Sequence, residues 1–193
     1  MKKGLFTVQM LVEGIPVREF VFGGKTYFLI KEGSIFTLLF QNDTDGKVEI
    51  NTFVDGLSVM DGRVFGFDGR ICGCLVSPRD SVHILGYGSS SIPFRLNSRP
   101  DSEVCLMDKP TNIGNITIRF YSEYILPELY CPISTVGSIP RSPNRTEILS
   151  PFGPSRHSKS FQRDRMIESL IVGYNDEAGF AAAGIIVPPE TTD

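Results

Sequence analysis

The sequence predicts an all-β protein, an antiparallel β sandwich of the jelly-roll or Ig-like type, with a long arm rich in proline, arginine and serine and a C-terminal β-hairpin. Two Asp-Gly pairs, at residues 55–56 and 61–62, flank a short apolar segment, and Asp-Gly supplies the positive φ angles of a tight turn. The preceding fifty or so residues alternate between apolar and polar. The 19 Gly and 13 Pro, with no Trp, favour short strands punctuated by turns over helices.

The first strands are predicted from apolar runs with short glycine-bearing gaps. Residues 5–12, 15–22 and 26–30 form such runs, separated at Gly14 and at Gly23-Gly24. Gaps of this kind are hairpin signals, so the three runs are expected to be consecutive antiparallel strands.

Residues 35–40 are apolar on nearly both faces, which is typical of a strand at the centre of a sandwich. After a polar turn at 42–46, residues 47–54 alternate and predict a strand with one wetter face. Shorter strands are expected at 81–85 and 92–96, and a half-buried strand at 115–121.

A long arm is predicted after the last of these strands. Residues 127–154 contain six prolines, and residues 141–165 carry six Arg or Lys against two acidic residues, a local excess of four positive charges. Such a segment cannot bury enough apolar surface to fold alone, so we expect it to order against a partner. The residues expected to contact that partner are Ile133, Val136, Ile139, Arg141, Arg145, Ile148, Leu149, Phe152 and Arg156.

The chain is therefore divided into a β-sandwich domain at 1–126, an extended partner-contacting arm at 127–164, and a C-terminal hairpin and tail at 165–193 that pack on the sandwich. The hairpin is predicted from β-branched runs at 166–174 and 180–187 around a glycine-ended loop. The alternative is a mixed fold with one helix near 161–173.

Residues with catalytic or metal-binding chemistry are few and scattered. His83 lies in an expected strand and His157 in the arm, without a nucleophile motif near either. Asp43, Asp45, Asp55 and Asp61 could hold calcium at one end of a sandwich, but ordinary turn chemistry explains aspartates at these positions. We expect no enzymatic activity, no metal and no cofactor.

The four cysteines, at positions 72, 74, 105 and 131, lack the spacing of a zinc site and are expected to be reduced and mostly buried in strands. The net charge of −3 does not favour nucleic-acid binding. No apolar run approaches the roughly 20 residues of a membrane span, and residues 5–12 look like a first strand rather than a secretory signal. The three Asn-X-Thr sequences, at Asn42, Asn115 and Asn144, are then chance matches to the glycosylation acceptor.

Four motifs occur in order along the chain: an opening at 12–17 with Val-Glu-Gly-Ile-Pro-Val, a Glu-Gly-Ser turn at 32–34, Val-Asp-Gly-Leu-Ser-Val-Met-Asp-Gly at 54–62, and Asn-Ile-Gly-Asn-Ile at 112–116. In these motifs the chain resembles a set of uncharacterised β-rich proteins of bacteria, phages and large DNA viruses. The resemblance covers roughly residues 5 to 121, departs from the family between residues 62 and 91, and implies a fold but no activity.

These observations predict a non-enzymatic structural or adaptor protein, a minor capsid-associated or cement component of a virus or phage particle whose partners are other protein subunits. Its expected location is the virion or the cytoplasm of the infected cell. The alternative is a glycan- or ligand-binding sandwich module, whose loops would present Phe65, Phe67 and Tyr87. The lack of Trp disfavours a sugar platform, because sugars usually stack on Trp and Tyr.

Overall fold

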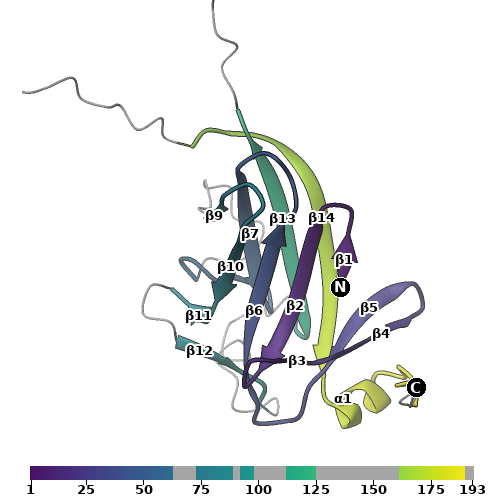
Figure 1. Cartoon of the computed structure of the whole chain (residues 1–193). Coiled ribbons are helices and arrows are strands. Elements are labelled where there is room, and N and C mark those ends of the chain that lie inside the picture. The colour runs from purple at the N-terminus through teal and green to yellow at the C-terminus, as the bar shows by residue number, and fades with distance from the viewer. Residues whose placement is uncertain (63–72, 89–91, 98–111, 125–160, 190–193) are drawn as a thin grey trace, which may run out of the picture.

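The structure is a computed structural model in which two β-sheets face each other across a shared hydrophobic core (Figure 1). It describes residues 1–62, 73–88, 92–97, 112–124 and 161–189. In these residues the predicted all-β architecture is confirmed, since strands dominate and the single helix has six residues. None of the described helical residues forms a helix long and apolar enough to cross a membrane.

The first sheet has the strand order β1-β2-β6-β12-β11, with β3 beside β2 and β10 beside β6. The neighbouring strands pair antiparallel. The strands of this sheet are β1 (Lys2–Lys3), β2 (Phe6–Val12), β3 (Ile15–Pro16), β6 (Ile35–Asn42), β10 (Ser81–Ile84), β11 (Gly86–Tyr87) and β12 (Ile92–Arg95).

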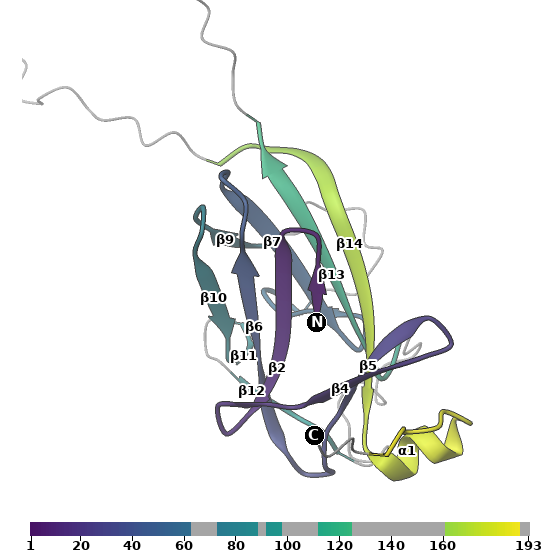
Figure 2. The ribbon, with the colours of Figure 1, turned by 45° about the vertical axis from the view of Figure 1, so that its right-hand side comes forward.

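The second sheet has the order β4-β5-β14-β13-β7-β8, with β9 beside β7. In Figure 2 the long strands β13 and β14 of this sheet lie to the right of β2 and β6 of the first sheet. Its strands are β4 (Arg18–Phe22), β5 (Lys25–Leu29), β7 (Val48–Val54), β8 (Leu57–Ser58), β9 (Cys74–Val76), β13 (Asn115–Glu123) and β14 (Arg163–Asn175).

The core lies between the sheets, where every second side chain of the central strands points inward. Phe6 of β2 stacks on Phe120 of β13 with ring centroids 4.1 Å apart, and Phe36 of β6 meets Tyr174 of β14 at 5.4 Å. These contacts join the two sheets, and burial of each such ring contributes about 2 to 3 kcal/mol. Other fully buried side chains are Val8, Met10, Leu38, Phe40, Ile50, Ile116 and Ile118.

The predicted central position of β6 is confirmed, because β6 pairs with β2, β10 and β12. The wetter face predicted for 47–54 is wrong: all seven residues of β7 are buried, including Glu49 and Asn51. The outer face of β7 is covered partly by Gly73, whose backbone lies so close that a Cβ there would be 2.1 Å from the Asn51 side-chain oxygen. Only glycine fits that approach.

The run at 15–22, predicted as one strand, is divided between the sheets. Its first part is β3, which pairs with β2, and its second part is β4, which pairs with β5. The chain crosses at Val17, whose amide donates to the Met10 carbonyl at 2.9 Å. This crossing gives the sandwich its second sheet early in the sequence.

The predicted C-terminal hairpin is wrong. Residues 163–175 form the single long strand β14, and residues 180–187 form no strand: the helix α1 (Glu177–Ala182) and an extended tail follow instead. The Asp176 side chain caps the helix by accepting from the Gly179 amide at 2.7 Å, and the alanines that follow favour helix. The alternative helix near 161–173 is also wrong, since β14 occupies those residues.

The second sheet is not purely antiparallel, so the prediction of an antiparallel sandwich is wrong at this point. β14 pairs antiparallel with β13 but parallel with β5. A long β14 in the middle of the sheet therefore replaces the hairpin that was expected to pack on the outside.

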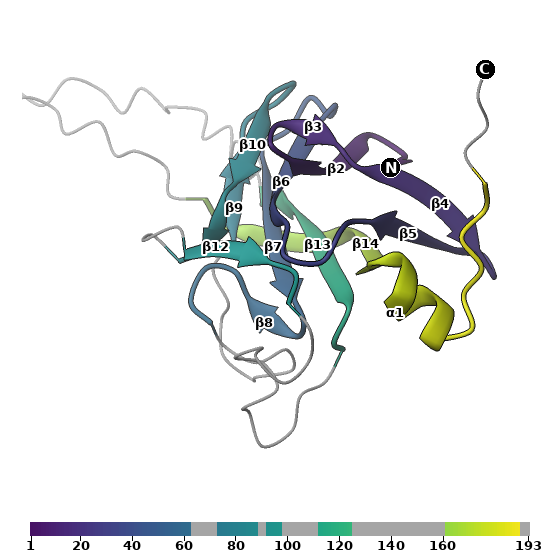
Figure 3. The ribbon, with the colours of Figure 1, turned by 90° about the horizontal axis from the view of Figure 1, so that it is seen from below.

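The helix α1 is attached to the second sheet by one aromatic side chain. Phe180 is 2% exposed and meets Phe20 of β4 edge-on at 5.2 Å and Tyr27 of β5 at 5.4 Å (Figure 3 shows α1 beside these strands). Such edge-to-face pairs contribute beyond the apolar area that they bury.

We expect Phe180→Ala to lower the free energy of unfolding by about 3 kcal/mol, because it removes the only buried side chain of α1 and leaves a cavity against Phe20 and Tyr27. Urea denaturation followed by circular dichroism measures the change. Ile186→Ala is the matched control, since Ile186 is 71% exposed and its truncation should cost less than about 0.5 kcal/mol. Equal effects of the two substitutions would contradict the packing of α1.

Candidate functional site

The turn between β7 and β8 is the centre of a polar cluster that joins three strands. Asp55 and Gly56 have φ angles of 53° and 82°, as predicted for this Asp-Gly pair. The Asp55 amide donates to the Asn115 carbonyl at 3.0 Å, and the Asp55 Oδ1 accepts from the Gly114 amide at 2.6 Å. Two of the motifs that carry the family resemblance, at 54–62 and 112–116, therefore meet in space.

Tyr174 of β14 completes this cluster. Its hydroxyl donates to the Asp55 Oδ2 at 2.7 Å, and its amide donates to the Gly114 carbonyl at 2.9 Å. Burial raises the pKa of the Asp55 carboxyl, although the hydrogen bonds from Tyr174 and Gly114 act in the opposite direction. Burial and the neighbouring carboxylate raise the pKa of Tyr174 well above its usual range, so its hydroxyl stays a donor.

An aromatic path connects this cluster with the first sheet. Tyr174 contacts Phe36, which stacks on Phe94 at 5.2 Å, and Phe94 meets Tyr87 edge-on at 4.8 Å. The Tyr87 hydroxyl donates to the Val54 carbonyl at 3.2 Å, next to Asp55. The polar atoms of the cluster form hydrogen bonds with one another. They hold the end of β7, the start of β13 and the end of β14 together. Tyr87, which is half-buried, is thus part of this aromatic path.

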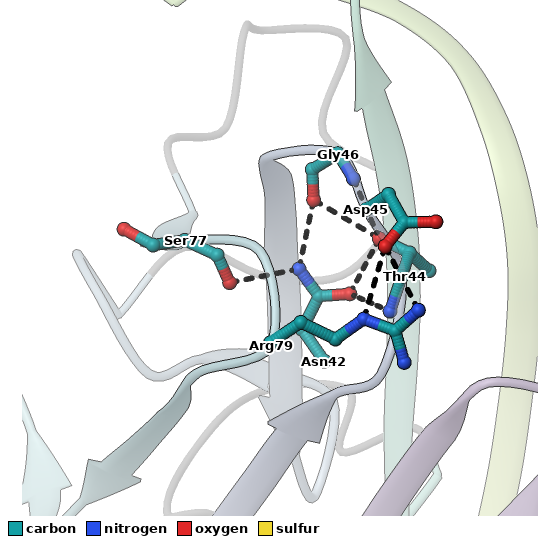
Figure 4. A network of polar contacts seen from close by, with 6 residues as sticks. All are labelled: Asn42, Thr44, Asp45, Gly46, Ser77 and Arg79. Carbon is teal, nitrogen blue, oxygen red and sulfur yellow. Dashed lines mark hydrogen bonds and ion pairs between the residues drawn. The ribbon is translucent and has the colours of Figure 1, made fainter.

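A second polar network fixes the turn between β6 and β7 (Figure 4). Asn42 is fully buried; its Oδ1 accepts from the Thr44 amide at 3.0 Å and hydroxyl at 2.7 Å, and its Nδ2 donates to the carbonyls of Gly46 at 2.9 Å and Ser77 at 3.0 Å. The amide of Asn42 is thus committed to holding two loops together.

The four aspartates considered for calcium do not converge. Asp45 binds Arg79 at 2.8 Å, and Asp43 binds Lys2 at 3.3 Å. Asp55 lies at the other end of β7, about 20 Å away for a strand of this length. Within the described ranges, no group of three or more His, Cys, Asp or Glu side chains could hold a metal ion.

A buried ion pair lies where β13 ends and β14 begins. Arg163 donates from Nε and Nη2 to the two carboxylate oxygens of Glu49 at 2.9 and 2.7 Å, and its guanidinium lies 4.3 Å from the ring centre of Tyr121. Glu49 also accepts from the Gly73 amide at 2.7 Å. The side chains of Glu49 and Arg163 are 9% and 20% exposed, so this bidentate pair is shielded from water.

The nine arm residues predicted to contact a partner lie outside the described residues, as do His157, Phe65, Phe67 and three of the four cysteines. Of the other candidates, His83 lies on β10, and its Nε2 is 2.7 Å from the Thr37 hydroxyl. Cys74 is half-buried on β9 with its sulfur 3.5 Å from that of Met60, and burial raises the pKa of its thiol.

Sequence reasoning missed Tyr174, Asn42 and the Glu49–Arg163 pair. Asn42 had a local signal, since an Asn that opens a polar turn commonly bonds to the backbone two residues on. Glu49 and Arg163 are 114 residues apart and had no such signal.

No protein-family model, no curated protein and no solved structure matches this chain. The resemblance to β-rich proteins of bacteria, phages and large DNA viruses therefore stays a prediction.

Proposed function

We propose that the protein is a non-enzymatic structural or adaptor component of a larger assembly, whose arm at 127–164 contacts neighbouring subunits. The finer proposal is a minor capsid-associated or cement protein of a virus or phage particle, located in the virion or in the cytoplasm of the infected cell. Other subunits of that assembly are the proposed partners.

One observation carries this proposal: the arm leaves and re-enters the sheet at a single point. Glu123 of β13 is opposite Arg163 of β14, and the Tyr124 amide donates to the Gln162 carbonyl at 2.7 Å. The described residues on either side of the arm therefore lie next to each other on two neighbouring strands. Whatever the arm contacts, its two ends are fixed on the rigid part of the molecule.

The Glu49–Arg163 ion pair supports the proposal that the arm is anchored where β13 ends and β14 begins. It fastens the first residue of β14 to β7, two strands away in the sheet, and places the Arg163 guanidinium on Tyr121 of β13. A partner bound to the arm would thus be connected to three strands of the second sheet, β7, β13 and β14, through these contacts.

We expect deletion of residues 134–160 to leave the sandwich folded and to abolish incorporation into the assembly. The ends of the arm are already adjacent on β13 and β14, so a short Gly-Ser linker can close the gap without strain. Circular dichroism and thermal unfolding check the fold. Mass spectrometry of purified particles checks incorporation.

The matched control keeps the length of the arm and replaces Ile148, Leu149 and Phe152 with serine. Loss of incorporation in both variants, with unchanged thermal unfolding, supports contact through the apolar side chains. Normal incorporation of the deletion variant, or absence of the intact protein from particles, would overturn the proposal.

A further inference from the structure

β4 is a free edge of the second sheet. Among the described strands it pairs with β5 alone, and it lies at the end of the strand order (Figure 3). Val21 in this strand is 66% exposed. Within the described part of the chain, no hydrogen bond involves the backbone groups on the outer side of β4.

The other edge strands are short or interrupted, whereas β4 is not. β1, β3, β8 and β11 have two residues each, with two lysines in β1 and a proline in β3. β9 and β10 have three and four residues. Monomeric proteins guard their edges with such devices, because an open edge templates the pairing of another strand. β4 has five residues with no proline or bulge, and its charged residues are Arg18 and Glu19 at its beginning.

The hairpin fixes which backbone groups of β4 face outward. Phe22 pairs with Lys25 across a two-residue turn of Gly23 and Gly24, both with positive φ, so Phe22 and Lys25 form a hydrogen-bonded pair. Hydrogen-bonded pairs alternate along an antiparallel ladder. The N–H and C=O groups of Glu19 and Val21 therefore point away from β5, toward the free side.

The sequence of β4 matches its own copy in one antiparallel register. With Phe20 opposite Phe20 of the second copy, Glu19 and Val21 of each copy form hydrogen-bonded pairs with Val21 and Glu19 of the other, which makes four backbone hydrogen bonds. A register shifted toward the start of β4 places Glu19 opposite Glu19 of the second copy. It also needs the Val17 amide as a donor, but that amide already donates to the Met10 carbonyl. A register shifted toward the end of β4 needs Gly23 to pair as a strand residue. Its φ of 57° is that of a turn residue, so it cannot extend the strand.

We propose that β4 is a homodimer interface, in which the β4 strands of two copies pair antiparallel about a two-fold axis at Phe20 and join the second sheets into one continuous sheet. The aromatic rings of Phe20 then face each other as a cross-strand pair. The tail at 184–189 lies beside this strand, where the Arg18 side chain donates to the Pro188 carbonyl and, at 2.9 Å, to that of Pro189, so the pairing of two copies requires the tail to stay clear of the Glu19 and Val21 backbone groups.

Val21→Pro tests the interface, because it removes an outward N–H without removing a bond of the β4–β5 ladder, and proline is tolerated on such an edge. Val21→Thr is the matched control, since it keeps the N–H and the β-branched shape. In sedimentation equilibrium, the mass of the intact protein and of the Thr variant should rise from 21.4 kDa toward twice that value between about 10 µM and about 1 mM, the range of a weak interface. The Pro variant should stay at the monomer mass.

Hydrogen exchange gives a second measurement that does not depend on a variant. Exchange of the Glu19 and Val21 amides should slow as the protein concentration rises, whereas exchange of the Phe20 and Phe22 amides, which are bonded to β5, should not change. An intact protein that remains monomeric throughout, or a Pro variant that dimerises like the Thr variant, would overturn the proposal. The arm takes no part, so the variant lacking residues 134–160 should still dimerise even if the proposed function fails.

Discussion

Replacing Asp55 with alanine is expected to lower the free energy of unfolding by about 3 kcal/mol. The substitution leaves the buried Tyr174 hydroxyl and the Gly114 amide without their acceptor, and each loss of this kind costs about 1 to 3 kcal/mol. Alanine also fits the φ of 53° less well than Asp does. Urea denaturation at neutral pH measures the effect.

Asp55→Asn is the control for this substitution, because asparagine tolerates a positive φ and keeps an oxygen for the Gly114 amide. Its effect should depend on pH. Burial holds the pKa of Asp55 above its unfolded value, so the stability that the protonated carboxyl contributes is complete below the unfolded pKa and is lost as the pH rises through the folded pKa. The stability of Asp55→Asn relative to the native chain should therefore improve from pH 4 upward, and a constant difference would contradict a raised pKa.

Replacing Glu49 with alanine is expected to cost about 3 kcal/mol, because it leaves the Arg163 guanidinium largely buried without its carboxylate. The loss should appear as a lower urea midpoint. Asp45→Ala is the matched control: its ion pair with Arg79 has side chains 90% and 63% exposed, so its removal should cost less than about 1 kcal/mol.

A double substitution separates two contributions to the loss of stability: the missing attraction between Glu49 and Arg163, and the cost of leaving the Arg163 charge buried without a partner. Glu49→Leu with Arg163→Met removes both charges, and replacing a whole buried pair by apolar groups is often neutral, so it should recover most of the stability. If the double variant is as unstable as Glu49→Ala, the hydrogen bond from Gly73 to Glu49 contributes more than the ion pair.

The sequence by itself predicts the features that depend on residues close together in the chain, namely turns and the alternation of individual strands. The Asp55-Gly56 turn needs two adjacent residues with positive φ, and these residues supply them. Strands with one apolar face, such as β2 and β13, are predicted because their alternation matches the pleat. The lack of proline in β4 is also visible in its five letters.

The tertiary structure decided what depends on residues far apart. Tyr174 reaches Asp55 across 119 positions, and Arg163 reaches Glu49 across 114, so a strand predicted to have a wet face is buried on both. Residues 185–187 are β-branched, as in a strand, yet β14 already has a neighbour on each side, and the chain turns into α1 with Phe180 against Phe20. Local propensity amounts to less than about 1 kcal/mol per residue, and burial of one aromatic ring exceeds it.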